Sequence, residues 1–275
     1  VEPCALAAIG HAHIDLAYLW TVAQSKTKAG RTFANVLRLA EANPSYRFSQ
    51  SMPFLYESVE QEFPQLSKDI DRAVKNGQWE VLSGMWVEAD INLSGGESLV
   101  RQLMLAQEYT RNRFGDQVTE VLWLPDCFGF VWSLPQLIKQ AGLRGLVTSK
   151  LTWNQTNNFP HQLFQWQGID GTRVPTALLV TPRDVAYLPF PASYKAELSA
   201  FEIHGTWKAW RQDDDHDELM IAYGYGDGGG GPTQELIDKL EVFASMPAAP
   251  QTRAATVSEY FDRLETRGTG HLPVW

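Results

Sequence analysis

The chain has 275 residues, 44% of them hydrophobic, which is enough for one large globular domain. Its 23 basic and 32 acidic residues give a formal net charge of −9, which argues against nucleic-acid binding, and no apolar run is long enough to span a membrane. The only cysteines, Cys4 and Cys127, exclude a disulfide framework and favour a reducing compartment, so we expect a cytoplasmic protein.

Short apolar segments alternate with longer segments of helical periodicity along the whole chain. The expected strands are residues 5–10, 46–51, 79–83, 120–124, 144–149, 176–180, 219–223 and 253–257. The expected helices are residues 32–43, 53–75 in two pieces broken at Pro64, 98–114, 134–141, 233–243 and 258–265. Residues 155–201 are less regular, and we expect an insertion there with a hairpin of residues 164–166 and 173–180.

This alternation of strands and helices is typical of a parallel sheet with helices on its outside. Seven or eight such repeats favour an α/β fold built as a distorted, mostly parallel β/α barrel of seven to eight strands. In such a barrel the carboxyl ends of all strands meet at one face, where the active site lies. Polar residues that follow an expected strand are therefore the first candidates for chemistry.

The first candidate site follows the strand at residues 5–10. His11, His13 and Asp15 alternate along an extended segment, so their side chains would project to the same side. Imidazole nitrogens and carboxylate oxygens are usual zinc ligands. The pattern favours a metal site, although a hydrogen-bonded polar cluster at the end of a strand would have the same sequence.

Two further strand ends carry a carboxylate. Asp126 follows the strand at residues 120–124 among aromatic residues, where a charge needs a partner or a metal, or it could be a structural helix N-cap. Asp227 follows the strand at residues 219–223 in a run of glycines, which allow the backbone to approach a ligand closely. One or two carboxylates with a metal would suit hydrolysis, and a pair about 5–5.5 Å apart would suit a retaining glycosidase.

Several segments of the sequence resemble the α-mannosidases of glycoside hydrolase family 38, and the bacterial and cytosolic type in particular. These segments are residues 11–15 (HAHID), 31–33, 84–88, 96–102, 123–126 (WLPD), 134–136 and 224–233 (GYGDGGGGPT). They follow the family's order over the whole chain. The resemblance implies a retaining exo-α-mannosidase that hydrolyses terminal α-linked mannose from oligosaccharides through a covalent glycosyl-enzyme.

The resemblance also implies roles for individual residues. His13, Asp15 and Asp126 would bind one catalytic zinc ion, or cobalt or another divalent metal in its place. Asp126 would also be the nucleophile, and Asp227 would be the acid/base. The metal would hold two hydroxyl groups of the terminal mannose. The residues expected to bind the substrate are Tyr18, Trp86, Asp90 and Phe128.

The sequence departs from the family pattern at several points. Tyr18 stands where the family has a tryptophan that stacks on the sugar, and Gln24 stands where it has an acidic residue. The family's fourth metal ligand is a histidine beyond the segment that here stops at Trp275. Because the chain also opens without Met, we expect residues 1–275 to be the single α/β catalytic domain of a longer enzyme, with 268–275 starting a connector to a helical domain.

Two other functions remain compatible with these residues. An amidohydrolase or a polysaccharide deacetylase also carries two such histidines on its first strand, but needs more histidines where this chain has Asp126 and Asp227. A non-catalytic carbohydrate-binding fragment would keep the same acidic and aromatic site. The expected partners are an α-mannoside oligosaccharide and other domains of the same polypeptide, without nucleic acid or membrane, and the sequence leaves an oligomer open.

Overall fold

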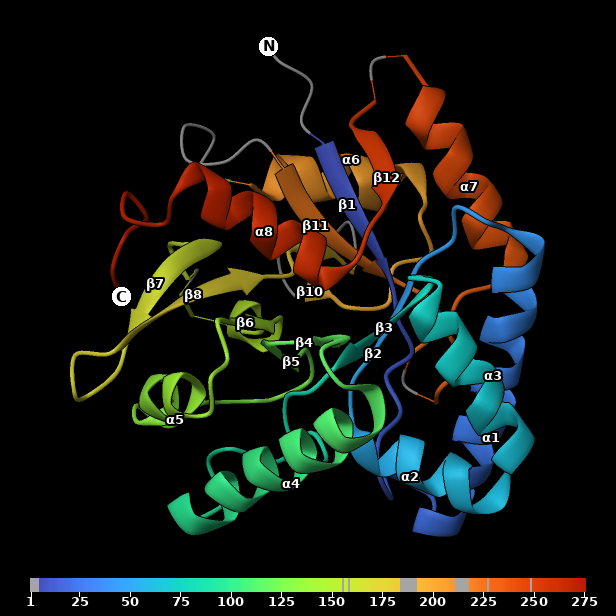
Figure 1. Cartoon of the computed structure of the whole chain (residues 1–275). Coiled ribbons are helices and arrows are strands. Elements are labelled where there is room, and N and C mark those ends of the chain that lie inside the picture. Colours follow the sequence, from blue (N-terminus) through green and yellow to red (C-terminus); the bar gives the residue numbers. More distant parts are fainter. Residues whose placement is uncertain are drawn as a thin grey trace.

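The computed structural model describes residues 5–154, 156–157, 159–183, 192–210, 218–226, 228–247 and 249–275. Its longer strands form two sheets, and the helices pack around them (Figure 1). Strands and helices alternate along most of the chain, as the sequence predicts. The α/β class with a mostly parallel sheet is therefore confirmed.

The first sheet is parallel and is built around β1 (Ala5–Gly10). The other strands are β11 (Glu218–Tyr223), β12 (Gln251–Ala254), β2 (Phe48–Gln50), β3 (Trp79–Leu82) and β4 (Val118–Thr119). β1 pairs with β11 and β12 and, through its last residue Gly10, with β2. Every residue of β1 after Ala5 is buried, as expected for an apolar strand in the middle of a sheet that is covered on both faces.

The prediction of a single barrel is wrong, because a second sheet is present. It contains β5 (Val121–Leu124), β6 (Gly145–Thr148), β8 (Arg173–Leu178) and β7 (Leu163–Gln167), of which only β7 is antiparallel. β4 pairs with β3 and β5 pairs with β6, although only Glu120 separates β4 from β5. The chain thus passes from one sheet to the other at Glu120, so the longer described strands form two separate sheets instead of one closed ring of seven to eight strands.

Most helices lie where the periodicity predicts them: α2 (Pro53–Glu62), α3 (Pro64–Lys75), α4 (Gly96–Phe114), α5 (Leu134–Gln140), α7 (Gln234–Ser245) and α8 (Val257–Arg267). α1 (Val22–Ala42) begins well before the predicted start at residue 32, because Thr21 and Gln24 form a capping box at its N-terminus. Gln24, which departs from the family pattern, therefore has a structural role. Within the described ranges, no helix is both long and apolar enough to cross a lipid bilayer.

Residues 155–201 contain more regular structure than the sequence predicts. The hairpin of β7 and β8 is confirmed. A short antiparallel pair, β9 (Thr181–Pro182) and β10 (Ala192–Ser193), follows it. α6 (Ala200–Ala209) begins at the end of this range and is absent from the sequence prediction. Gly205 in its middle disfavours a helix, but Ser199 and Glu202 form a capping box at its start.

The last residues of the chain extend the edge of the second sheet. The Gln165 N–H donates to Pro273 O at 2.8 Å, and the Trp275 N–H donates to Gln165 O at 3.0 Å. Residues 273–275 therefore lie parallel to β7. The expected role of residues 268–275 as the start of a connector stays a prediction.

Candidate active site

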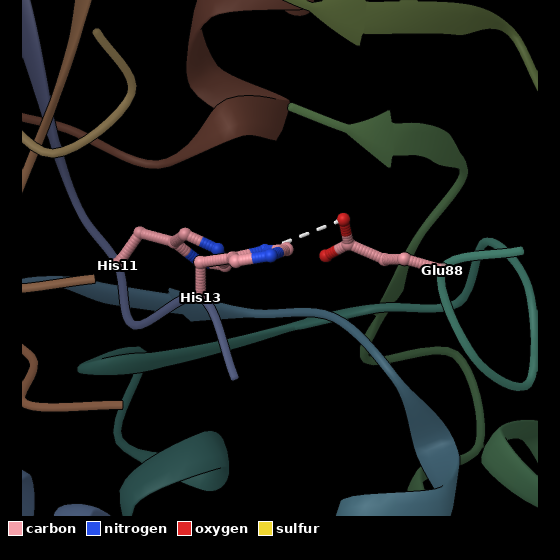
Figure 2. Close-up of side chains that lie close together, drawn as sticks. All are labelled: His11, His13 and Glu88. Atoms are coloured by element: carbon pink, nitrogen blue, oxygen red, sulfur yellow. Dashed lines mark ion pairs between the residues drawn. The ribbon is translucent and has the colours of Figure 1, made fainter. Parts of the chain in front are cut away.

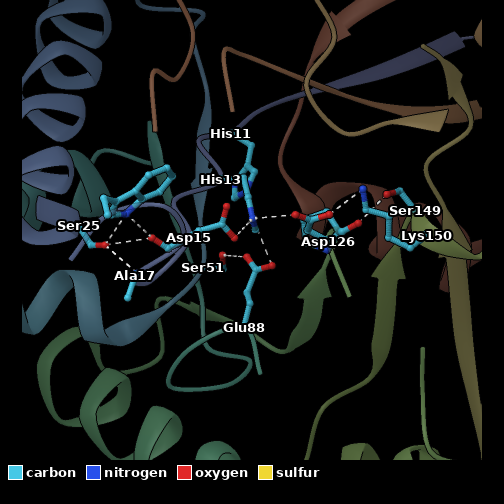
Figure 3. Close-up of polar contacts among 12 residues, drawn as sticks. His11, His13, Asp15, Ala17, Ser25, Ser51, Glu88, Asp126, Ser149 and Lys150 are labelled. Carbon is cyan, nitrogen blue, oxygen red and sulfur yellow. Dashed lines mark hydrogen bonds and ion pairs between the residues drawn. The ribbon is translucent and has the colours of Figure 1, made fainter. Parts of the chain in front are cut away.

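The carboxyl ends of several strands meet around His13. His13 and Asp15 follow β1, Glu88 lies beyond the end of β3, Asp126 follows β5 and Lys150 follows β6 (Figure 3). The structure thus brings Asp15 and Asp126 together, as the strand-end argument predicts. The third carboxylate of that argument, Asp227, lies outside the described residues.

The buried imidazole of His13 is the centre of this cluster. Its Nε2 lies 3.0 Å from Asp15 Oδ1 and 3.4 Å from Asp126 Oδ2, and its Nδ1 lies 3.4 Å from Glu88 Oε2. Burial alone would lower the pKa of His13, but the negative charge of Glu88 and the contacts with Asp126 and Asp15 raise it well above its usual value. Without a metal, the imidazole therefore carries a proton at neutral pH.

The donor set fits a divalent metal. His13, Asp15 and Asp126 each offer one ligand atom, and these atoms lie within 4.8 Å of one another. One imidazole with two carboxylates is a usual zinc environment. Glu88 faces the other ring nitrogen of His13, as the carboxylate behind a metal-bound histidine commonly does, and Ser51 Oγ donates to Glu88 Oε1 at 2.9 Å.

His11 lies beside His13 (Figure 2). Both ring nitrogens of His11 already have partners. Nδ1 lies 2.8 Å from Ser49 O, and the Trp123 indole N–H donates to Nε2 at 3.1 Å. Burial lowers the pKa of His11 to about 3, so the ring is neutral, donates through Nδ1 and accepts through Nε2. His11, His13 and Glu88 also lie close together, but His11 has no lone pair left for a metal. It therefore holds the segment in place.

Asp126 lies between His13 and Lys150. Its Oδ1 forms an ion pair of 2.7 Å with Lys150 Nζ. Burial alone would raise the pKa of Asp126, but the contacts with His13 and Lys150 lower it to about 2, so this carboxylate is ionised at neutral pH. The alternative that Asp126 is a helix N-cap is wrong, because the next helix, α5, begins at Leu134 and has Ser133 as its N-cap.

The glycine-rich loop after β11 packs directly on the segment that carries His13. A Cβ atom at Gly224 would lie 2.4 Å from His11 O, and this residue has φ +129°, so only glycine fits. A Cβ atom at Gly226 would lie 3.4 Å from the Cβ of His13. The residue that follows is Asp227, the predicted acid/base, which lies outside the described residues.

Two of the predicted substrate-binding residues border the cluster. Phe128 is exposed, and its ring centre lies 4.7 Å from Lys150 Nζ. Tyr18 is also exposed and packs edge-on against Trp20, whose indole N–H donates to Asp15 O at 3.1 Å. Both side chains therefore have free surface next to residues of the cluster.

The other two predicted substrate-binding residues make contacts of their own. The Trp86 ring packs edge-on against Phe54 and Tyr109. Asp90 Oδ1 accepts two backbone N–H groups within its own turn, at 3.1 and 3.2 Å. Their contact with a sugar stays a prediction.

Four residues of the cluster were not selected from the sequence: Ser51, Glu88, Lys150 and Tyr194. Ser51 and Lys150 follow the ends of β2 and β6 closely, and Glu88 lies farther beyond the end of β3. A single serine, glutamate or lysine after a strand carries no specific signal for a metal or catalytic site. Tyr194 follows β10 in the irregular segment, and its ring centre lies 5.1 Å from that of His13. No local pattern predicts its place.

Comparison with known proteins points to one family. The family description "Glycosyl hydrolases family 38 N-terminal domain" matches residues 3–275. Alpha-mannosidase G of Dictyostelium discoideum is 36% identical over 258 residues, which are 94% of this chain and 23% of that protein. Alpha-mannosidase 2C1 of Homo sapiens is 35% identical over 259 residues, which are 94% of this chain and 24% of that protein. The chain thus spans about a quarter of the length of these relatives.

Solved structures share the fold. An alpha-mannosidase from Enterococcus faecalis V583 has a TM-score of 0.78 and 17% identity, over 98% of this chain and 30% of that chain. A 4-alpha-glucanotransferase from Thermococcus litoralis has a TM-score of 0.61 and 15% identity, over 96% of this chain and 41% of that chain. At such identities the likeness concerns the fold alone.

Proposed function

This chain belongs to glycosyl hydrolase family 38, and on that premise we propose that it carries the active site of a retaining, metal-dependent exo-α-mannosidase. The substrate would be a terminal α-linked mannose of an oligosaccharide. The observation that carries the proposal is the meeting of His13, Asp15 and Asp126, whose ligand atoms lie within 4.8 Å of one another.

His13, Asp15 and Asp126 would hold zinc, or cobalt or another divalent ion. When bound, the ion supplies positive charge that neutralises the two carboxylates and holds hydroxyl groups of the sugar. Glu88 would keep the proton of His13 on Nδ1, since its Oε2 lies 3.4 Å from that atom, and would leave Nε2 free as a ligand.

In the first step of the proposed reaction, an oxygen of Asp126 attacks the anomeric carbon while the glycosidic C–O bond breaks. The product is a glycosyl ester of Asp126, and Asp227 would give its proton to the departing oxygen. Because the pKa of Asp126 is lowered to about 2, the carboxylate is ionised and ready to attack at neutral pH.

In the second step Asp227 would act as a base and take a proton from water. The water oxygen attacks the anomeric carbon, the ester bond to Asp126 breaks, and the carboxylate is restored. Each step inverts the anomeric carbon, so the configuration of the substrate is retained.

We also propose that this α/β domain works within a longer polypeptide, which is supported by the small share of each relative that it covers, 23% and 24%. A cytoplasmic location is proposed because the sequence has only two cysteines.

A metal-dependent amidohydrolase or deacetylase is the second candidate, because a metal site of histidine and carboxylates at the carboxyl ends of the strands would also suit it. Such sites use further histidine ligands. In the described parts of the chain, the candidate metal groups draw only on His11 and His13, and His11 is already bound to Ser49 and Trp123. The glycosidase is therefore favoured.

The test uses the polypeptide at its full natural length and an aryl α-mannoside. We expect mannose release that is lost on treatment with a chelator and restored by zinc, and NMR of the first product should show the α-anomer. Initial release of the β-anomer would contradict retention, and full activity after complete metal removal would contradict metal dependence. Release of acetate from an acetylated sugar, without mannose release, would favour the deacetylase.

A further inference from the structure

Lys150 has an unusual environment for a lysine. Its side chain is only 5% exposed, and its ammonium lies 2.7 Å from Asp126 Oδ1. The same nitrogen lies 3.7 Å from the ring centre of Trp153, 4.7 Å from that of Phe128 and 5.1 Å from that of Tyr194. The charge is thus enclosed by three aromatic faces and one carboxylate.

Two of the three aromatic rings around Lys150, those of Trp153 and Tyr194, are held in place by other contacts. The Trp153 indole N–H donates to Ala192 O at 2.8 Å. Tyr194 is buried and also contacts the ring of His13 edge-on, with 5.1 Å between ring centres. Because these contacts restrict the rings of Trp153 and Tyr194, the ammonium has little freedom to leave Asp126.

The two oxygens of Asp126 therefore face different neighbours (Figure 3). Oδ1 is buried against Lys150, while Oδ2 lies 3.4 Å from His13 Nε2. A buried Oδ1 cannot reach a sugar, so the glycosyl ester would form through Oδ2. Oδ1 would then be the carbonyl oxygen of the ester, still in contact with Lys150.

We propose that Lys150 is a positioning residue that fixes the Asp126 carboxylate through Oδ1 and favours breakdown of the glycosyl-enzyme. The inference rests on the proposed function. In the breakdown step, water adds its oxygen to the anomeric carbon and gives its proton to the base. The bond from that carbon to Oδ2 breaks, and its electron pair returns to the Asp126 carboxylate, where the Lys150 ammonium stabilises the negative charge.

The experiment compares the full-length wild type with Lys150→Met, which keeps a long side chain between the rings but removes the charge. We expect kcat on an aryl α-mannoside to fall roughly 10²–10³-fold, as on loss of one oriented charge donor. KM should fall with it, because breakdown becomes the slow step, and mass spectrometry of rapidly quenched samples should show accumulated glycosyl-enzyme. Lys150→Arg should recover kcat to within about tenfold of the wild type.

Lys239→Met is the matched control, since it removes an ion pair of 2.8 Å, with Glu235, on the surface of α7. It should leave kcat and KM unchanged. Zinc affinity, measured by competition with a chromophoric chelator, should not fall in Lys150→Met. A fall in zinc affinity that parallels the loss of activity would overturn the inference, because the effect would then lie in the metal site.

Two other results would also overturn it. One is wild-type kcat and KM in Lys150→Met. The other is a loss of kcat without accumulated glycosyl-enzyme. If Lys150→Met does not fold, Lys150→Gln provides the same comparison without charge. A wild type that releases no mannose and forms no glycosyl-enzyme would refute the proposed function together with the inference, whereas an active wild type with a normal Lys150→Met variant would refute the inference alone.

Discussion

Glu80 and Asp126 are two largely buried carboxylates whose oxygens have very different neighbours. Glu80, in β3, accepts hydrogen bonds from the Thr119 hydroxyl at 2.7 Å and from the backbone N–H groups of Val257 and Ser258 at 2.8 Å each. The Ser49 hydroxyl also donates to it. These donors are neutral and fixed, and two of them are the free N–H groups at the start of α8.

Asp126 instead faces groups that ionise. Its neighbours are the imidazole of His13 at 3.4 Å and the ammonium of Lys150 at 2.7 Å. A proton on His13 can be exchanged for a metal ion, whereas nothing can replace the donors of Glu80 without breaking the fold. The comparison indicates that Glu80 belongs to the scaffold and Asp126 to the site.

The largest expected effect comes from Asp126→Asn. An amide cannot form the glycosyl ester, so kcat on an aryl α-mannoside should fall on the order of 10⁴-fold or more. The free energy of unfolding should fall less than in Glu80→Gln, because Asp126 makes no hydrogen bond that closes a helix or a strand. Normal turnover by this variant would refute the role of nucleophile.

Glu80→Gln should have the opposite profile. The new amide NH₂ group would face one of the donors that the carboxylate now accepts, so the free energy of unfolding should fall by about 3 kcal/mol. Because Glu80 lies outside the site, kcat per folded molecule should not change. Chemical denaturation together with the activity assay measures both.

The control for Glu80→Gln is Glu97→Gln on α4, which removes an exposed ion pair with Arg101. It should change the free energy of unfolding by less than about 0.5 kcal/mol. If Glu80→Gln were as mild as this control, or if it lowered kcat, the assignment of Glu80 to the scaffold would be wrong.

Glu88→Gln tests a carboxylate whose neighbours combine features of Glu80 and Asp126, since one is a neutral hydroxyl and the other is the imidazole of His13. Glu88 contacts His13 Nδ1 at 3.4 Å on one side and accepts from the Ser51 hydroxyl at 2.9 Å on the other. Loss of its charge should weaken zinc binding roughly 10–100-fold, as for other carboxylates behind a metal-bound histidine. The measurement is competition with a chelator, and Glu235→Gln on α7 is the control. Unchanged zinc affinity would place Glu88 in the scaffold with Glu80.

Individual strands and their ends could be predicted from the sequence better than the pairing of these strands into sheets. β1 was predicted with its observed bounds, and its apolar run followed by His13 and Asp15 located the site. The break between β4 and β5 was missed, because one intervening residue, Glu120, leaves no mark in the hydrophobic pattern. Whether adjacent strands join the same sheet depends on pairing across the fold, which local sequence does not encode.

Prediction of the candidate site from local sequence has the same limit. Asp15 and Asp126 were found because each follows an apolar strand within a recognisable motif. Lys150 also follows a strand, but a single lysine in a polar segment carries no such signal. Its importance comes from Asp126 and Tyr194, which lie far from it in the sequence. Contacts of this kind become visible only in the folded chain.

The pH dependence of zinc binding tests the contrast between Asp126 and Glu80 without a mutation, and each pH unit should change it by less than the substitutions above. His13 must lose its proton before Nε2 can bind zinc, and its pKa is raised well above 6.5. Zinc affinity should therefore rise about tenfold per pH unit until the pH passes that pKa, with release of about one proton per zinc. His11 does not contribute, because its pKa is lowered to about 3.

The free energy of unfolding of the metal-free protein should fall as the pH rises, whereas the zinc affinity rises. Because the folded state raises the pKa of His13, the stabilisation that its proton provides is complete below pH 6.5 and is lost as the pH rises through the raised value. The chelated protein should thus lose stability at alkaline pH while zinc binds more tightly there. Chelator competition and thermal unfolding from about pH 6 to pH 9 measure both trends. A zinc affinity that does not change over this range would mean that His13 is already neutral. Asp126 would then not differ from Glu80 in having a neighbour that exchanges a proton for a metal ion.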